Sequence, residues 1–382
     1  MAGIQITIRN FAFGGESYGV LPSGKGCFVR GAVPGERVTV EIVSEHARFV
    51  RAKLLSVDTP DPCRIAPECP YADRCPGCAF QHVSSADELR WKQDIFARFM
   101  TGCGVEKERI LPSVPAPERF GWRNKIHLAV ENGAAGYRGE DNVSLVPVSG
   151  CLLAVPAINA ALREIDLRGR DHVELRYTPR DGVVRLDGND RDRILRDTLP
   201  GFGDFPVPAG AFFQTNPAVA ASLTEDAVEL IRKSGRDFLT ELHCGAGIFS
   251  LCAAMRIPGL RTAGAEITSA SIACARRAAG SFEVSSRCRF FHRDAAAFYR
   301  ERKNTSLLLV DPPRSGLDRV LTREIVRRPP EVMIYVSCAP DTLQRDLKNL
   351  SACGLQVVST RLFNMFPCTA HFESLTLLKR GR

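Results

Sequence analysis

The sequence contains no run of about 20 apolar residues, which is the length that a membrane-spanning helix requires. Its first residues, "MAGIQITIRNFAFGG", lack the basic segment followed by an apolar segment that marks a secretory signal peptide. No internal repeat or low-complexity segment stands out. These absences argue against a helical membrane protein and against a secreted one, so we expect a cytoplasmic protein without membrane contact.

The composition, with 45% hydrophobic and 25% charged residues, is typical of a soluble globular protein, and the 382 residues are enough for two or three domains. Lysine and arginine exceed the acidic residues by 51 to 43, and the net charge of +8 is compatible with an anionic partner such as RNA. Fourteen cysteines without a secretion signal favour metal binding or thiol chemistry over a disulfide scaffold, although most should be core residues.

Residues 1–57 alternate between apolar and polar side chains in short runs such as "IQITIR", "GCFVRG", "RVTVEIV" and "VRAKLLSV", separated by glycine- and proline-rich turns. This pattern predicts a small antiparallel β-barrel of the kind that binds oligonucleotides. An alternative interpretation is a barrel whose charges are only solvated. The basic and aromatic residues that are candidates for RNA contact are Arg9, Tyr18, Lys25, Arg30, Arg48 and Arg51.

Residues 58–208 are expected to form a central, mixed α/β domain. A group of cysteines at 63–78 precedes "SSADELRWKQDIFARFMTGCG", whose apolar spacing predicts a helix that starts near Ser85. The strand-like runs "NKIHLAV", "SLVPVSG", "HVELRYT" and "GVVRLDG" follow, between glycine and aspartate turns.

Residues 209–382 alternate between strands and helices. The expected strands are "DFLTELHCG", "RTAGAEI", "CRFFHRD", "SLLLVDPP", "VMIYVSC", "LQVVST" and "ESLTLLKR", with helices such as "SIACARRAAGSF" and "PDTLQRDLKNLSACG" between them. Alternation of this kind predicts a doubly wound, Rossmann-like α/β domain with a parallel sheet. Ligands of such sheets bind beyond the carboxyl ends of the strands.

The first turn of this domain, "ELHCGAGIFSL", allows the backbone at Gly245 and Gly247 to approach a ligand closely. Glu266 ends the next strand about 20 residues later, where an acidic residue is expected to bind ribose hydroxyls. Together these features indicate a nucleoside-containing cofactor. Asp294, at the end of the third strand, is a candidate for adenine contact, and capping of the following helix is an equally good interpretation.

The fourth and fifth strands end in groups with chemistry of their own. Pro312 restricts Asp311 to an extended conformation at the ligand edge of the sheet. The next strand ends on Ser337 and Cys338. A thiolate is a soft nucleophile that can add to carbon 6 of a uracil ring, which turns carbon 5 into a nucleophile for a methyl sulfonium.

Carbon 5 then carries an extra proton, which a base must remove before the thiol is expelled. Glu373 starts the final strand and is the candidate base, with His371 two residues earlier on the same side of an extended segment. A surface glutamate at a strand entrance is the alternative, and the company of Cys338 and Asp311 favours the base.

With these residues in place, the chain resembles the S-adenosylmethionine-dependent RNA uracil-5 methyltransferases, in particular the ribosomal-RNA branch with a TRAM barrel and a 4Fe-4S cluster. The motifs that carry the resemblance are "AFFQTN", "HCGAGIFSL", "AGAE", "VDPPRSG", "YVSCAPDTLQRDL" and "FPCTAHFE", in family order along essentially the whole chain. The resemblance implies Cys338 as nucleophile and Glu373 as proton acceptor. The family's cofactor-binding positions fall on Gln214, His243, Glu266, Asp294 and Asp311.

A metal centre is the second implication. "CPYADRCPGC" contains Cys69, Cys75 and Cys78, and the resemblance places a fourth ligand at Cys151. Spacing alone leaves zinc and an iron-sulfur cluster open, and the resemblance favours 4Fe-4S. Cys63 lies outside the family pattern and is a spare or substitute ligand, and unliganded reduced thiols are the remaining alternative.

The chain departs from the family pattern at several positions. Glu241 stands where aspartate is common, and His243 stands where an aromatic residue is common. Ala339 replaces the asparagine after the nucleophile, which removes an amide that could orient the base or the loop. Cys368 and Ala370 stand where histidine is frequent. Nucleophile and base are both present, so activity is expected.

The sequence therefore predicts a monomeric enzyme that methylates carbon 5 of a uridine in 23S ribosomal RNA, with S-adenosylmethionine and a covalent cysteine–uracil adduct. Transfer RNA is an alternative substrate for the same chemistry. Methylation of an exocyclic amine is a rival reaction, but it needs no thiol, and Arg314 stands where such enzymes carry an aromatic residue. A noncatalytic RNA-binding iron-sulfur protein is the alternative from another class.

Overall fold

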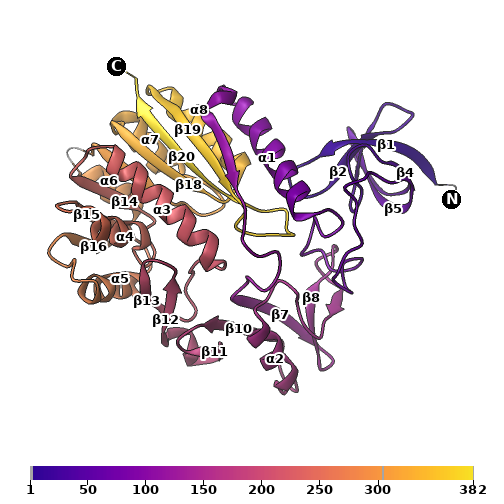
Figure 1. The fold of residues 1–382 in the computed structure, drawn as a ribbon, viewed down its shortest axis with the longest axis horizontal. Helices are drawn as coiled ribbons and strands as arrows, with labels where there is room; N and C mark the ends of the chain where they lie inside the picture. The colour runs from indigo at the N-terminus through magenta and orange to yellow at the C-terminus, as the bar shows by residue number, and fades with distance from the viewer. Residues whose placement is uncertain (1–2, 303–304, 382) are drawn as a thin grey trace.

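The computed structural model describes residues 3–302 and 305–381, which form three parts arranged side by side (Figure 1). The N-terminal part is a closed barrel, and the central part contains a sheet with one short α-helix. The C-terminal part is a large sheet covered by helices. Within the described residues, no helix combines the length and the apolar character needed to cross a membrane.

The barrel closes in the strand order β1-β2-β3-β5-β4. Alternate side chains such as Ile6, Ile8, Val38 and Val40 point inward and form its own core, as the period-two pattern predicts. The second strand falls in "SYGV", a stretch that reads as a turn because glycine and serine surround it. The strands are β1 (Ile4–Phe11), β2 (Ser17–Val20), β3 (Gly26–Val29), β4 (Arg37–Glu45) and β5 (Phe49–Thr59).

A cysteine-bearing loop leads from the barrel to helix α1 (Ser85–Thr101). The N-cap is Ser84, one residue before the predicted start, and its side chain accepts a hydrogen bond of 3.1 Å from the Asp87 N–H. After the short helix η1 (Lys107–Arg109), the chain forms β6 (Ile110–Val114).

The central region is built on a five-stranded sheet in the order β11-β10-β7-β8-β9, beside a two-stranded sheet of β12 and β13. The predicted runs all form strands here. Its elements are β7 (Lys125–Glu131), β8 (Ala134–Arg138), β9 (Leu145–Pro147), α2 (Pro156–Glu164), β10 (His172–Thr178), β11 (Gly182–Arg185), η2 (Gly188–Asp192), β12 (Ile194–Leu199) and β13 (Gly203–Pro208).

The C-terminal part is an α/β domain whose eight-stranded sheet has the order β16-β15-β14-β17-β18-β20-β19-β6. Its strands are β14 (Phe238–Leu242), β15 (Arg261–Glu266), β16 (Cys288–His292), β17 (Leu307–Val310), β18 (Val332–Ser337), β19 (Leu355–Phe363) and β20 (Glu373–Arg380). Its helices are α3 (Pro217–Lys233), α4 (Ile248–Arg256), α5 (Ser269–Ser281), α6 (Ala295–Glu301), α7 (Arg319–Arg327) and α8 (Pro340–Ser351).

Strands β14 to β18 are parallel, and β20 runs antiparallel between β18 and β19. Both faces of the sheet are covered, so central strands such as "LLLV" are continuously apolar rather than alternating. Leu307 and Leu309 pack on the face with α3, α4 and α5, while Leu308 and Val310 pack on the face with α6, α7, α8 and α1. The predicted parallel sheet is therefore confirmed for β14 to β18, whereas the final strand β20, also expected to be parallel, runs antiparallel.

Strand β6 lies within the predicted central domain but pairs in parallel with β19 at the edge of the large sheet. Helix α1 packs against α8 on the same side. The segment between barrel and central sheet thus contributes a layer to the C-terminal domain.

Candidate functional site

The glycine turn after β14 is held open for a ligand by its backbone geometry. His243, Gly245 and Gly247 all have positive φ angles, of 58°, 52° and 79°. A Cβ on Gly247 would lie 2.7 Å from the Phe290 ring, so only glycine allows this turn to pack so tightly against the sheet. Helix α4 begins at the next residue, and its N-terminus faces the same edge.

Glu266 joins two strand ends at this edge. It is the last residue of β15, and its Oε2 accepts a hydrogen bond of 3.2 Å from the Gly245 N–H. Its Oε1 accepts one of 2.9 Å from the Thr268 N–H. The carboxylate is only partly buried, so oxygen lone pairs stay available to a ligand beside the turn.

Three other predicted cofactor residues lie in different surroundings. Asp294 is exposed, and its Oδ1 caps α6 by accepting 2.9 Å from the Ala297 N–H, so the capping role is present whether or not a ligand is bound. Gln214 is buried in the segment before α3, where its backbone carbonyl accepts a hydrogen bond of 3.1 Å from Asn124 Nδ2. His243 Nδ1 is buried with no hydrogen-bond partner among residues 3–302 and 305–381.

Strand pairing brings the predicted nucleophile and base together. Ser337 pairs with Ser374 across the antiparallel strands β18 and β20, so Cys338 and Glu373 lie side by side at one end of that pair. Asp311 follows β17, the parallel neighbour of β18, at the same edge. Cys338 is half-buried and Glu373 is buried. The thiol therefore lies at the ligand edge, as predicted.

Burial and neighbouring carboxylates raise the pKa of each of these three acidic groups. Burial, and then the charges of Glu373 and Asp311, raise the pKa of Cys338 to about 12. Burial, and then Asp311, raise the pKa of Glu373 well above its usual range. Burial, and then Glu266, raise the pKa of Asp311 to about 7. The site thus holds more acidic groups than can ionise together, which is typical of a site that binds a cation or moves protons.

One basic side chain, Arg314, acts on this cluster. Arg314 follows the Asp-Pro-Pro turn, and its charge lowers the pKa of both Cys338 and Glu373, although burial outweighs it. Burial, and then the Arg314 charge, lower the pKa of His371 to about 4, so this imidazole is neutral near pH 7. Sequence reasoning used Arg314 only to exclude an aromatic residue. The position of Arg314 directly after two prolines in the sequence was the feature that could have placed it near this cluster.

The departure at Ala339 is compensated locally. Ala339 is the N-cap of α8 and makes no side-chain capping bond. Instead, Ser337 Oγ accepts a hydrogen bond of 3.2 Å from the Ala339 N–H, and Thr342 Oγ1 donates one of 3.1 Å to the Ala339 carbonyl. The turn that presents Cys338 is thereby held without an asparagine.

The four predicted metal ligands, Cys69, Cys75, Cys78 and Cys151, line one small enclosed cavity of about 20 Å³. All four are free thiols, and the Tyr137 hydroxyl beside them is buried without a partner among the described residues. Within 3–302 and 305–381, however, no three His, Cys, Asp or Glu side chains form a group that could hold a metal ion. The four thiols therefore line one cavity without the close spacing of a metal-ion site.

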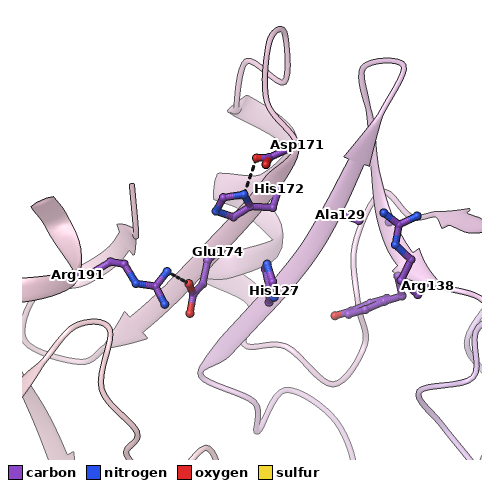
Figure 2. A pocket seen from close by; sticks show the side chains of 9 residues that line it. His127, Ala129, Arg138, Asp171, His172, Glu174 and Arg191 are labelled. Carbon is purple, nitrogen blue, oxygen red and sulfur yellow. Dashed lines mark hydrogen bonds and ion pairs between the residues drawn. The ribbon is translucent and has the colours of Figure 1, made fainter. Parts of the chain in front are cut away.

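A more open cavity of about 530 Å³ lies on the central sheet, away from the strand ends of the large sheet (Figure 2). His127 and His172 meet edge to face on its floor, with ring centroids 5.5 Å apart. Both carboxylates that line it already have partners: Glu174 pairs with Lys125 and Arg191, and Asp171 contacts His172. None of the predicted site residues lines this cavity, so its size does not make it the centre of the chemistry.

Comparisons with known proteins agree with the strand-end site. Residues 204–381 match the family model described as tRNA (uracil-5-)-methyltransferase. An uncharacterized RNA methyltransferase of Aquifex aeolicus is 28% identical, with 98% of each chain covered. Another from Thermosynechococcus vestitus is also 28% identical, covering 99% of this chain and 98% of the relative.

The fold as a whole also has a solved counterpart. The structure of Pyrococcus abyssi tRNA (uracil-54, C5)-methyltransferase in complex with S-adenosyl-L-homocysteine superposes with a TM-score of 0.76 at 24% identity. The match covers 98% of this chain and 99% of that one, so barrel, central region and α/β domain share one overall fold with it. The likeness to the tRNA (uracil-5-)-methyltransferase family model therefore lies in residues 204–381, which contain Cys338 and Glu373.

Proposed function

We propose that this protein transfers a methyl group from S-adenosylmethionine to carbon 5 of a uridine in 23S ribosomal RNA. The observation that carries the proposal is the pairing of Cys338 with Glu373 across β18 and β20, with Asp311 on the adjacent strand end. A thiol beside a buried carboxyl suits addition to a conjugated ring followed by proton removal. An amine methyltransferase would need neither group.

The reaction follows from these positions. Cys338 Sγ forms a bond to carbon 6 of the uracil, and the electron pair of the carbon 5–carbon 6 double bond moves toward the ring carbonyl. Carbon 5 then attacks the methyl carbon of the sulfonium, whose carbon–sulfur bond breaks to leave S-adenosylhomocysteine. Glu373 takes the proton from carbon 5, and the double bond re-forms as the carbon 6–sulfur bond breaks and returns the thiolate.

The ionisation of Cys338 and Glu373 depends on whether the positively charged cofactor is bound. Because burial and neighbouring acids raise the pKa of Cys338 to about 12, the protein alone holds a thiol near pH 7. The pKa of Glu373 is also raised by burial, which favours the protonated carboxyl over the carboxylate in the protein alone. A positive charge bound beside Asp311 favours the ionised forms of all these groups. Binding of a sulfonium would therefore activate both the nucleophile and the base.

The glycine turn and Glu266 support S-adenosylmethionine as the methyl donor. Gly245 and Gly247 let the backbone approach a ligand, and Glu266 offers carboxylate oxygens at the position expected for ribose hydroxyls. The Pyrococcus abyssi relative was solved with the demethylated product of that cofactor. We assign Gln214, His243, Asp294 and Asp311 to the same ligand.

We further propose that Cys69, Cys75, Cys78 and Cys151 hold a 4Fe-4S cluster. The support is their convergence on one enclosed cavity next to the unpartnered Tyr137 hydroxyl. When bound, such a cluster would supply a covalent link between the 69–78 loop and the loop before α2. Arg30 from the barrel donates 3.0 Å to the Pro76 carbonyl and 3.3 Å to the Cys78 carbonyl, so the same loop also supports the barrel.

Transfer RNA is the second candidate substrate, favoured by the family description and by the Pyrococcus abyssi enzyme. In either RNA the target base must leave its stack to reach Cys338, which is easiest in a single-stranded loop. Mass mapping of 5-methyluridine in ribosomal and transfer RNA, from cells with and without the gene, decides between them. A missing modification in 23S RNA supports the first substrate, and one in transfer RNA supports the second.

The chemistry itself is tested with RNA that contains 5-fluorouridine. Fluorine at carbon 5 cannot be removed as a proton, so the methylated adduct should stay attached to Cys338 and shift the protein on a denaturing gel. Cys338→Ala should abolish capture, whereas Cys353→Ala, which changes a half-buried thiol after α8, should leave it unchanged. Capture by Cys338→Ala, or none by the wild type with S-adenosylmethionine present, would refute the mechanism.

A further inference from the structure

The loop that leads to the proposed base is held by helix α1, which precedes residues 209–382 in the sequence. Residues 364–372 join β19 to β20 and lead directly into Glu373. Two side chains of α1, Glu88 and Lys92, reach this loop, and both are completely shielded from solvent. They lie 2.7 Å apart, one helical turn from each other.

Glu88 holds the backbone of Cys368. The Cys368 N–H donates to both carboxylate oxygens of Glu88, at 2.9 and 3.0 Å. The Cys368 carbonyl accepts from the N–H groups of Ala79 and Phe80, at 2.8 and 2.9 Å. Cys368 has a φ of 66°, in the left-handed region that a residue with a Cβ seldom adopts. Hydrogen bonds on both sides of the residue keep it in this strained conformation.

Lys92 holds the preceding part of the loop. Its Nζ donates 2.8 Å to Asn364 Oδ1 and 3.0 Å to the Phe366 carbonyl. Thr369 Oγ1 donates a hydrogen bond of 2.9 Å to the same carbonyl and accepts one of 3.2 Å from the His371 N–H. A chain of hydrogen bonds therefore links Lys92 to His371, which lies two positions before Glu373.

A buried ion pair is a poor way to gain stability, because desolvation of the two charges offsets their attraction. Burial also lowers the pKa of Lys92, which shows that its charge is unfavourable there. Apart from each other, Glu88 and Lys92 bond to atoms of one loop, at Asn364, Phe366 and Cys368. The pair therefore suits a role in fixing one loop conformation.

We propose that Glu88 is a positioning residue for Glu373. It acts through the Cys368 backbone and fixes where β20 begins, and so where the Glu373 carboxyl lies relative to Cys338. This inference rests on the proposed uracil-5 methylation and assigns part of that machinery to a helix outside residues 204–381, the range of the family match. Misplacement of a reacting group by about 1 Å can lower a rate by about 100-fold.

The test separates proton removal from the earlier steps. Glu88→Gln keeps the shape of the side chain but replaces one acceptor by a donor and leaves Lys92 without its partner. We expect formation of 5-methyluridine on ordinary RNA to fall about 100-fold. Capture of 5-fluorouridine RNA, which requires no base, should keep the wild-type rate, and a covalent adduct should accumulate on ordinary RNA. The pH profile of turnover should change shape.

Arg90→Gln is the matched control, because it removes an exposed ion pair with Asp87 on the same helix. If Glu88→Gln does not fold, Glu88→Gln combined with Lys92→Met removes the unpaired charge and the same measurements apply. Wild-type turnover in the variant, or an equal fall in capture and turnover, would overturn the positioning role. Absence of capture by the wild-type protein would instead count against the proposed function, whatever the variant does.

Discussion

Glu241 should make the folded protein less stable as the pH rises. Its side chain is fully buried behind the glycine turn, where Oε2 accepts 2.9 Å from the Ser250 N–H. Oε1 has no hydrogen-bond partner within the described residues. Burial raises the pKa of this carboxyl from 4.5 to about 8. The folded protein therefore keeps a proton that the unfolded chain releases between these two pH values, and stability falls as pH increases through that range.

The size of the effect follows from the pKa difference of about 3.5, which corresponds to about 5 kcal/mol above pH 8. Glu241→Gln removes this ionisation. The new amide brings N–H donors into a place without acceptors, at a cost of about 1–3 kcal/mol. At pH 5 wild type has lost only about 1 kcal/mol, so the variant should be less stable than wild type by about 0–2 kcal/mol. At pH 8 wild type has lost about 4 kcal/mol, so the variant should be more stable by about 1–3 kcal/mol.

Urea unfolding at pH 5, 6, 7 and 8 measures this reversal through the denaturation midpoint. Burial also raises the pKa of Asp311 and Glu373, so wild type and variant should both lose stability as pH rises, with the smaller loss in the variant. Glu225→Gln, which changes an exposed carboxyl on α3, should leave the wild-type slope intact. Parallel curves for Glu241→Gln and wild type would refute the reasoning.

Two further predictions concern the turns at the strand ends. Gly247→Ala should destabilise the protein by about 3 kcal/mol, because φ is 79° and the new Cβ would lie 2.7 Å from the Phe290 ring. Gly245→Ala should cost only about 1 kcal/mol, because φ is 52° and no atom lies within 4 Å of the new Cβ. Urea unfolding measures both changes in stability. Ala339→Asn should add about 1 kcal/mol by capping α8, and an unchanged midpoint would show that the bond from Ser337 already suffices.

The strand-end residues could be predicted because their chemistry is local. Parallel strands place their carboxyl ends at one edge, so Glu266, Asp311 and Cys338 could be assigned to that edge from the positions where apolar runs stop. The pairing of Ser337 with Ser374 then brought Glu373 beside the thiol. For the ends of the parallel strands, the pattern of apolar runs in the sequence and the rule on carboxyl ends were sufficient.

Contacts between distant segments could not be predicted in this way. Glu88 and Lys92 lie in a helix whose charged residues are expected to face water, and only the packing of α1 against the loop before β20 buries them. Strand β2 was missed because Ser17 and Gly19 in "SYGV" have weak strand propensity, and pairing with β1 and β3 in the barrel stabilises the strand. The start of α1 was predicted correctly at Ser85, and the side chain of Ser84 caps it.

The position of β6 affects how this protein could be shortened. A fragment that begins at residue 209 would keep every proposed reacting group but would leave β19 with one unpaired side and α8 without its covering helix. Exposed strand edges recruit other chains, so such a fragment is expected to aggregate rather than to serve as a minimal enzyme. Loss of the N-terminal segments by truncation or gene rearrangement would thus inactivate the protein before any reacting group changed.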